Sequence, residues 1–176
     1  MRNLKLAFAA FLFAVILCSC HHSSGGDMVQ TFPIQSELES EYKVLDWSEL
    51  TPEERHQYRR VNYVIDSQED FPDENLLGLD RIKSMNIDFE KYTLLLSYNL
   101  IPGIVEGHKY LWTKNLQEGV FELWMHFDTV VPESGTSSGA LLEAGSQSEA
   151  PFIITYYCTA LLVNKIPAHS QVIFWL

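Results

Sequence analysis

Gly107-His-Lys-Tyr-Leu-Trp-Thr-Lys114 and Val120-Phe-Glu-Leu-Trp-Met-His-Phe-Asp128 are two β-forming runs joined by Asn115-Leu-Gln-Glu-Gly119. Aromatic and β-branched residues on both sides of a short Asn- and Gly-containing segment predict a β-hairpin. Pairing Lys114 with Val120 predicts one face with the opposed pairs Trp112–Glu122, Tyr110–Trp124 and His108–His126. The other face is then the core face, with Leu111, Phe121, Leu123, Met125 and Phe127.

The first of these faces gives the candidate binding residues Tyr110, Trp112, Trp124, His108 and His126. A helix covering the face would make these aromatics ordinary core residues. An exposed face would instead be a platform for a sugar ring or a protein partner. His108, His126 and Asp128 could converge on a metal ion, but neither a CxxC nor an HExxH motif supports such a site. We therefore expect no metal and no cofactor.

The rest of the chain predicts an α+β fold, with a mostly antiparallel sheet and two short helices packed over it. Thr51-Pro-Glu-Glu54 is a capping box that should start a helix ending near Arg60. Ser67 should cap a second helical segment. Strands are expected at residues 28–34, 42–47, 61–66, 93–98, 152–164 and 172–176. Residues 93–98, apolar on both faces, should form a central strand.

A Pro/Ser/Gly-rich loop at residues 132–150 offers one catalytic alternative. Within it, Gly135-Thr-Ser-Ser-Gly139 matches the G-x-S-x-G pattern, with Ser137 as nucleophile. Glu143 or Glu149 and then His169 follow in the chain order of α/β-hydrolases. That elbow needs a tight strand-to-helix turn over a parallel sheet, and the chain has no βαβ series. A small serine hydrolase is therefore a minor alternative, and we expect no enzymatic activity.

The N-terminal segment predicts the cellular location. Arg2 and Lys5 precede an apolar run that ends at Leu17-Cys-Ser-Cys20. The small Ser19 before Cys20 resembles the lipobox of bacterial lipoproteins, although an ordinary signal peptide or an anchor helix is the alternative. The prediction is a signal peptide at residues 1–19, lipid on Cys20 and a flexible tether at residues 20–27. A single globular domain should follow at residues 28–176, in the bacterial cell envelope.

Charge narrows the range of partners. The chain has 12 Lys and Arg residues against 23 Asp and Glu, a net charge of −11. Signal cleavage would remove Arg2 and Lys5 and make the balance still more acidic. Such a surface repels nucleic acid and anionic headgroups, so membrane attachment should depend on the lipid. Cys158 would then be the one cysteine not used by signal or lipid, within an apolar run that suggests a buried hydrophobe.

A family resemblance extends over residues 61–176. Ile65-x-Ser67-x-x-x-Phe71 and Ile87-Asp88-Phe89-x-Lys91-Tyr92 are similar to segments in the C-terminal domain of the protease-complex protein PrcB and in small Bacteroidetes lipoproteins. Where that family has a Gly-Gly-Tyr-like segment, this chain has Ile104-Val-Glu-Gly-His-Lys-Tyr110. The resemblance implies an accessory or interaction role without catalytic residues. We therefore expect a non-enzymatic binding lipoprotein, with a glycan-binding module as the alternative.

Overall fold

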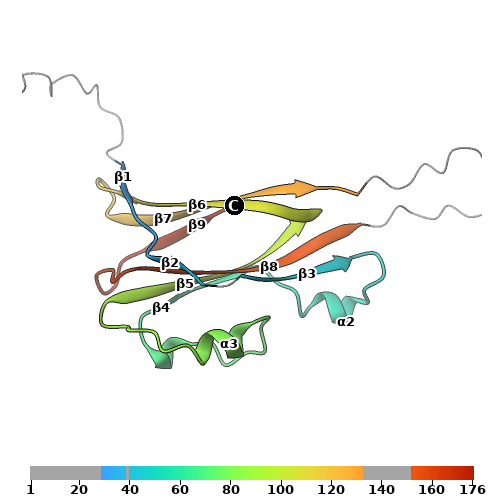
Figure 1. Cartoon of the computed structure of the whole chain (residues 1–176), viewed down its shortest axis with the longest axis horizontal. Coiled ribbons are helices and arrows are strands. Elements are labelled where there is room, and N and C mark those ends of the chain that lie inside the picture. The colour runs from blue at the N-terminus through green and yellow to red at the C-terminus, as the bar shows by residue number, and fades with distance from the viewer. Residues whose placement is uncertain (1–28, 39, 133–151) are drawn as a thin grey trace, which may run out of the picture.

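Two β-sheets packed face to face, with short helices against one of them, form the described part of the chain (Figure 1). The computed structural model describes residues 29–38, 40–132 and 152–176. The predicted class is confirmed: the protein is rich in mostly antiparallel strands and has two short α-helices. The strands divide between two sheets instead of forming one.

The first sheet has four strands in the order β1-β6-β7-β9. Its members are β1 (Val29–Phe32), β6 (Ile104–Asn115), β7 (Val120–Val130) and β9 (Val172–Trp175). The long β6–β7 hairpin forms its centre, and β9 runs parallel to β7. The strands predicted at both ends of the domain therefore lie at the two edges of this sheet.

The second sheet has the order β2-β8-β5-β4, with β3 also paired to β8. Its members are β2 (Ser36–Glu37), β3 (Glu41–Asp46), β4 (Val61–Ile65), β5 (Tyr92–Pro102) and β8 (Ile153–Asn164). β5 and β8 are buried along most of their length on both faces. The prediction that residues 93–98 form a central strand is confirmed.

Gly103 is the point where the chain crosses from one sheet to the other. It separates β5 from β6 and has a φ of 88°, a region that side-chain-bearing residues rarely adopt. Its N–H donates to the Ile153 carbonyl at 2.9 Å, and its carbonyl accepts the Thr155 hydroxyl at 2.6 Å. A Cβ at this position would lie 2.8 Å from the Val130 carbonyl oxygen. Glycine therefore allows the close approach that joins the sheets.

The helices lie against the outer face of the five-stranded sheet (Figure 1). α2 (Pro52–Arg55) begins with the predicted capping box, in which Thr51 and Glu54 bond reciprocally. It ends well before Arg60, and the following Tyr58 packs edge-on against Tyr156 at 5.1 Å. The segment after Ser67 is the 3₁₀ turn η1 (Gln68–Asp70). Gly78 precedes the second α-helix, α3 (Leu79–Lys83).

Two apolar cores result from this three-layer arrangement. Leu94 and Leu96 face the helices, with Ile65, Leu79, Ile82, Tyr98 and Tyr156 in the same cluster. Leu95, between them in sequence, faces the four-stranded sheet, because successive strand residues point to opposite faces. There it joins Trp112, Phe121, Leu123, Met125, Leu161 and Val163. The four-stranded sheet thus contributes one face to the core, and its other face is the outer surface of the sandwich.

Candidate functional site

The register of the β6–β7 hairpin decides which side chains reach the surface. Asn115, which we predicted as a loop residue, is the last paired residue and lies opposite Val120. Its side-chain oxygen accepts the N–H groups of Gln117 at 3.0 Å and Glu118 at 3.3 Å. Gly119 closes the loop with a φ of 70° and donates to the Asn115 carbonyl at 2.8 Å. The predicted register was therefore wrong by one residue.

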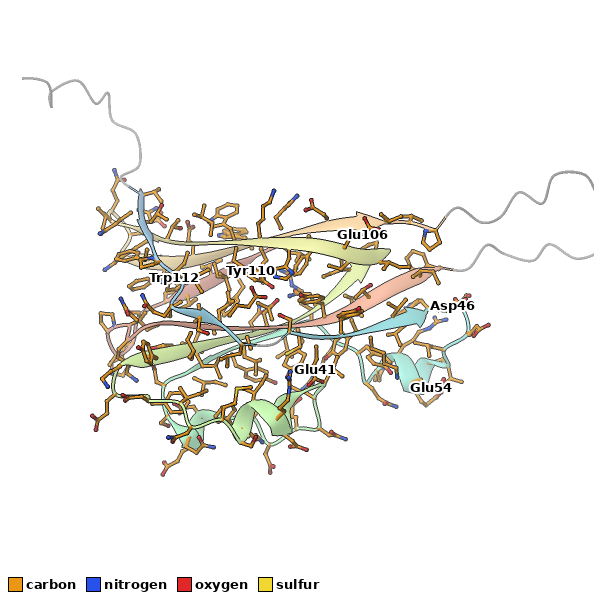
Figure 2. All side chains as sticks on the ribbon, in the orientation of Figure 1. Glu41, Asp46, Glu54, Glu106, Tyr110 and Trp112 are labelled. Carbon is orange, nitrogen blue, oxygen red and sulfur yellow. The ribbon has the colours of Figure 1, made fainter. Side chains whose placement is uncertain are left out.

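This correction moves Tyr110 and Trp112 from the predicted surface into the core (Figure 2). Trp112 lies opposite Leu123 and stacks on Phe121 with ring centroids 5.2 Å apart. The Tyr110 hydroxyl lies 3.3 Å from that of Thr159 on the other sheet, and burial raises the pKa of Tyr110. The cover over these aromatics is the second sheet and not a helix. The interpretation in which Tyr110, Trp112 and Trp124 share one exposed platform is therefore wrong.

His108 also lies between the sheets, where it connects three strands. Its Nε2 is 2.8 Å from a Glu37 carboxylate oxygen on β2. Its Nδ1 is 3.1 Å from the Tyr157 hydroxyl on β8. These partners belong to the five-stranded sheet, whereas His108 belongs to the four-stranded one. The contacts identify His108 as a polar connection between the two layers.

His126 occupies the opposite face of the same hairpin, exposed to solvent. Its Nε2 lies 3.3 Å from Asp128 on the same strand. His108 and His126 cannot converge on one ion, because the sheet separates them. Among the described residues, no group of three or more His, Cys, Asp or Glu side chains could hold a metal.

The outer face of the four-stranded sheet carries an apolar row that we call the tryptophan face, made of Leu111, Trp124 and Trp175. Leu111 lies opposite Trp124, and Trp124 lies beside Trp175 in the parallel β7–β9 pair. The two indoles stack at 5.2 Å with an interplanar angle of 24°. The exposed fractions are 47%, 45% and 41% in chain order. The row therefore crosses three strands on a face that no described helix covers (Figure 1).

Polar groups border this row. The Trp175 indole N–H donates a long hydrogen bond of 3.4 Å to Glu122 on β7. Lys109 lies opposite His126, next to the Leu111–Trp124 pair. Of our candidate binding residues, the structure places only Trp124 in the tryptophan face, with His126 at its border. Leu111 was assigned to the core and Trp175 was missed; strand alternation at residues 172–176 was the available signal for Trp175.

Of Cys158 and the predicted hydrolase residues, the structure describes Cys158 in the core and His169 at the surface. Cys158 is 1% exposed, and burial raises the pKa of its thiol to about 12, which confirms it as a core residue. His169 lies in an exposed turn with a φ of 64°. Ser137, Glu143 and Glu149, with the rest of residues 133–151, lie outside the described residues, as do Cys20 and the tether.

Comparisons with known proteins assign no function to the tryptophan face. Comparison with models of known protein families, with curated proteins and with solved structures finds no match. The resemblance to the PrcB C-terminal domain therefore stays a prediction. Within the described residues, no helix is long and apolar enough to cross a membrane.

Proposed function

We propose that this chain is a lipid-anchored accessory protein of the bacterial cell envelope, non-enzymatic, that docks a partner protein through its tryptophan face. One observation carries the proposal: the stacked pair Trp124–Trp175 is nearly half exposed on an outer sheet face. Tryptophan is enriched among the residues that dominate protein–protein binding energy. Contiguous exposed apolar surface on a soluble protein commonly marks an interaction site.

The geometry of the tryptophan face suits a protein surface. Leu111, Trp124 and Trp175 lie side by side on neighbouring strands and so form a continuous apolar strip. Stacking makes each indole restrict the other, and Trp175 also donates a long hydrogen bond to Glu122. Side chains ordered before binding lose less rotamer entropy on association. A partner with an apolar patch would therefore gain burial at a low ordering cost.

Charge indicates the chemistry of the partner. The chain has a net charge of −11, and its acidity attracts basic surfaces and repels acidic ones. Lys109 and His126 lie on one side of the apolar strip, with Asp128 next to His126, and Glu122 lies on the other side, so the immediate border has both signs. The proposed partner presents an apolar patch surrounded by a basic rim. Such complementarity would mainly accelerate association and would weaken with added salt.

The predicted anchor restricts where this partner can be. From Cys20 to the start of β1 at Val29, a fully extended chain spans at most about 30 Å. β1 is an edge strand of the sheet that carries the tryptophan face. Lipid on Cys20 would thus keep this face near the membrane surface. The proposed partner is a membrane protein or another protein held at the same surface.

Site-specific photo-crosslinking in the producing cell tests the proposal. A photoreactive residue at Leu111 should give one discrete protein adduct, and the same residue at exposed Glu69 on the helix side should not. Trp124→Ala or Trp175→Ala in the Leu111 background should abolish the adduct. With the purified partner, each substitution should weaken binding about thirtyfold, the effect of losing a hot spot of about 2 kcal/mol. Added salt should weaken binding of the unaltered protein.

Two results would overturn the proposal. One is a Leu111 adduct that persists in both tryptophan variants, since binding of the partner would then not depend on the Trp124–Trp175 pair. The other is a purified glycan that changes the tryptophan fluorescence of the native protein and loses this effect in Trp175→Ala. That second result would establish the glycan-binding alternative on the same face.

A further inference from the structure

A pocket with a mixed polar and apolar lining lies on the opposite side of the molecule, against the helix-covered face of the five-stranded sheet. It has a volume of about 350 Å³, within the size range of small-molecule sites. Lys43 on β3, Tyr58 after α2 and the segment 75–81 leading into α3 form its walls, and Tyr156 on β8 contributes from the sheet. Segments distant in sequence therefore build this pocket together.

Tyr156 lines the pocket and carries a buried hydroxyl group. Its residue is 2% exposed, and its hydroxyl has no hydrogen-bond partner among the described residues. The ring is fixed between Tyr58, edge-on at 5.1 Å, and Tyr98, stacked at 5.8 Å. Burial raises the pKa of Tyr156 to about 12, so the hydroxyl stays protonated at neutral pH. An unpaired buried hydroxyl costs free energy, which a ligand hydroxyl would recover.

The charges around the pocket cancel. The charged residues that line the pocket are Lys43, Arg81 and Asp80. Arg81 also pairs with Glu41 at 2.8 Å. Lys43 donates to the Tyr58 hydroxyl at 2.7 Å. Two cations and two carboxylates leave no net charge to select an ion. Asn75 and Gln57 add amide donors and acceptors. The lining therefore suits a neutral ligand with many hydroxyl groups.

Gly78 keeps this wall close to the sheet. Its φ of 70° lies in the left-handed region, and an added Cβ would approach the Glu41 carboxylate to 2.9 Å. Figure 2 shows Glu41 on the side of the sheet that faces α3. Because Gly78 has no side chain, its backbone can lie against the Glu41 carboxylate that pairs with Arg81.

We propose that this pocket binds a neutral, hydroxyl-rich small molecule, of which a terminal sugar unit is the representative class. Hydroxyl groups both donate and accept, and so match a lining that mixes amides, phenols and balanced charges. The Tyr156 hydroxyl would make one of these bonds. This site is separate from the tryptophan face, and neither proposal depends on the other.

Tyr156→Phe tests the assignment, since it removes only the hydroxyl. The probes are glucose, galactose, mannose and N-acetylglucosamine at millimolar concentration, with phosphate and acetate as ionic controls. Isothermal titration should detect at least one of the sugars and neither ion. Tyr156→Phe should weaken that binding about tenfold, the effect of one lost hydrogen bond. Its thermal stability without sugar should be unchanged or higher, because the unpaired buried hydroxyl is gone.

Two further variants make the result specific. Asn75→Ala, at an exposed lining position, should also weaken sugar binding without unfolding the protein. Trp124→Ala, on the far sheet, should leave it unchanged. The proposal fails if none of the four sugars binds, or if the sugar binds Tyr156→Phe as tightly as the native chain. Binding of phosphate or acetate without any sugar would also overturn it, because the pocket would then select an ion.

Discussion

Trp112 lies directly opposite Leu123 in the β6–β7 hairpin, and both side chains are buried between the two sheets. The next pair along the hairpin, Leu111 and Trp124, points away from the core and forms part of the tryptophan face. Because successive residues of a strand face opposite sides, these two neighbouring pairs have opposite environments. A single hairpin thus contributes both to the core and to the proposed docking surface.

Adjacent residues of β7 should therefore respond differently to truncation. Leu123→Ala removes a fully buried side chain and should lower the free energy of unfolding by about 2–5 kcal/mol. Trp124→Ala loses the stacked ring pair and should cost less than about 1.5 kcal/mol. Urea unfolding of both variants measures the difference. Equal destabilisation would mean that Trp124 is covered in solution.

Gly103, which precedes the β6–β7 hairpin, and Gly119, in its loop, should differ in their tolerance of a methyl group. Gly119→Ala meets no atom within 4 Å and should cost about 1–2 kcal/mol for its positive φ alone. Gly103→Ala also places a Cβ 2.8 Å from the Val130 carbonyl oxygen, which should add at least about 1 kcal/mol. Thermal unfolding of the two variants tests the ranking, and a Gly103→Ala protein as stable as Gly119→Ala would contradict it.

The Cys158 thiol should be unreactive in the native protein. It is buried, and burial raises its pKa to about 12, so little thiolate exists at neutral pH. Maleimide should label it slowly in native conditions and rapidly in denaturant. Cys158→Ser, which buries a hydroxyl, should cost about 1–3 kcal/mol where the hydroxyl lacks a partner. Rapid native labelling would show that the thiol is accessible.

Stability should fall in alkaline solution. In the folded state the pKa of Cys158 rises from 9.0 to about 12 and that of Tyr156 from 10.0 to about 12, mainly through burial. Between these values the unfolded chain has lost protons that the folded chain retains. Rising pH therefore favours unfolding, by about 1.4 kcal/mol per pH unit for each such group. Below about pH 9 this contribution to stability is fully present.

The control for the alkaline effect is Cys158→Ala. Its free energy of unfolding should decline less steeply between pH 9 and 12 than that of the native chain, whatever its stability at neutral pH. Urea titrations across this range measure both slopes. Identical slopes would indicate that Cys158 titrates alike in the folded and unfolded states.

Lipid attachment depends on Cys20. Because Ser19 and Leu17 place Cys20 at the processing position, Cys20→Ala should abolish incorporation of a fatty-acid analogue, whereas Cys18→Ala should not. Metabolic labelling followed by membrane fractionation gives the result. Label that persists on the Cys20→Ala protein would refute the lipobox assignment.

Local patterns account for the elements that the sequence predicted correctly. Residues 93–98 and 152–164 are apolar on both faces, and the structure buries both faces of β5 and β8. The capping box at Thr51 and Glu54 depends on contacts within one turn and forms as expected. The predicted end of α2 near Arg60 was wrong, because Tyr58 leaves the helix to pack on Tyr156, nearly a hundred residues away.

The sequence alone determined most of the strands of this protein, its first helix start and the burial of Cys158, because alternation, capping and apolar runs act between near neighbours. Only the tertiary structure decided the face of each hairpin residue. That outcome depends on the pairing of Asn115 with Val120. Side chains alternate between the two faces of a strand, so a shift of one residue in the pairing moves each side chain of the strand to the opposite face. The Trp124–Trp175 pair and the pocket at Tyr156 likewise required distant segments to meet. Such contacts depend on how the chain returns to itself, which no local pattern encodes.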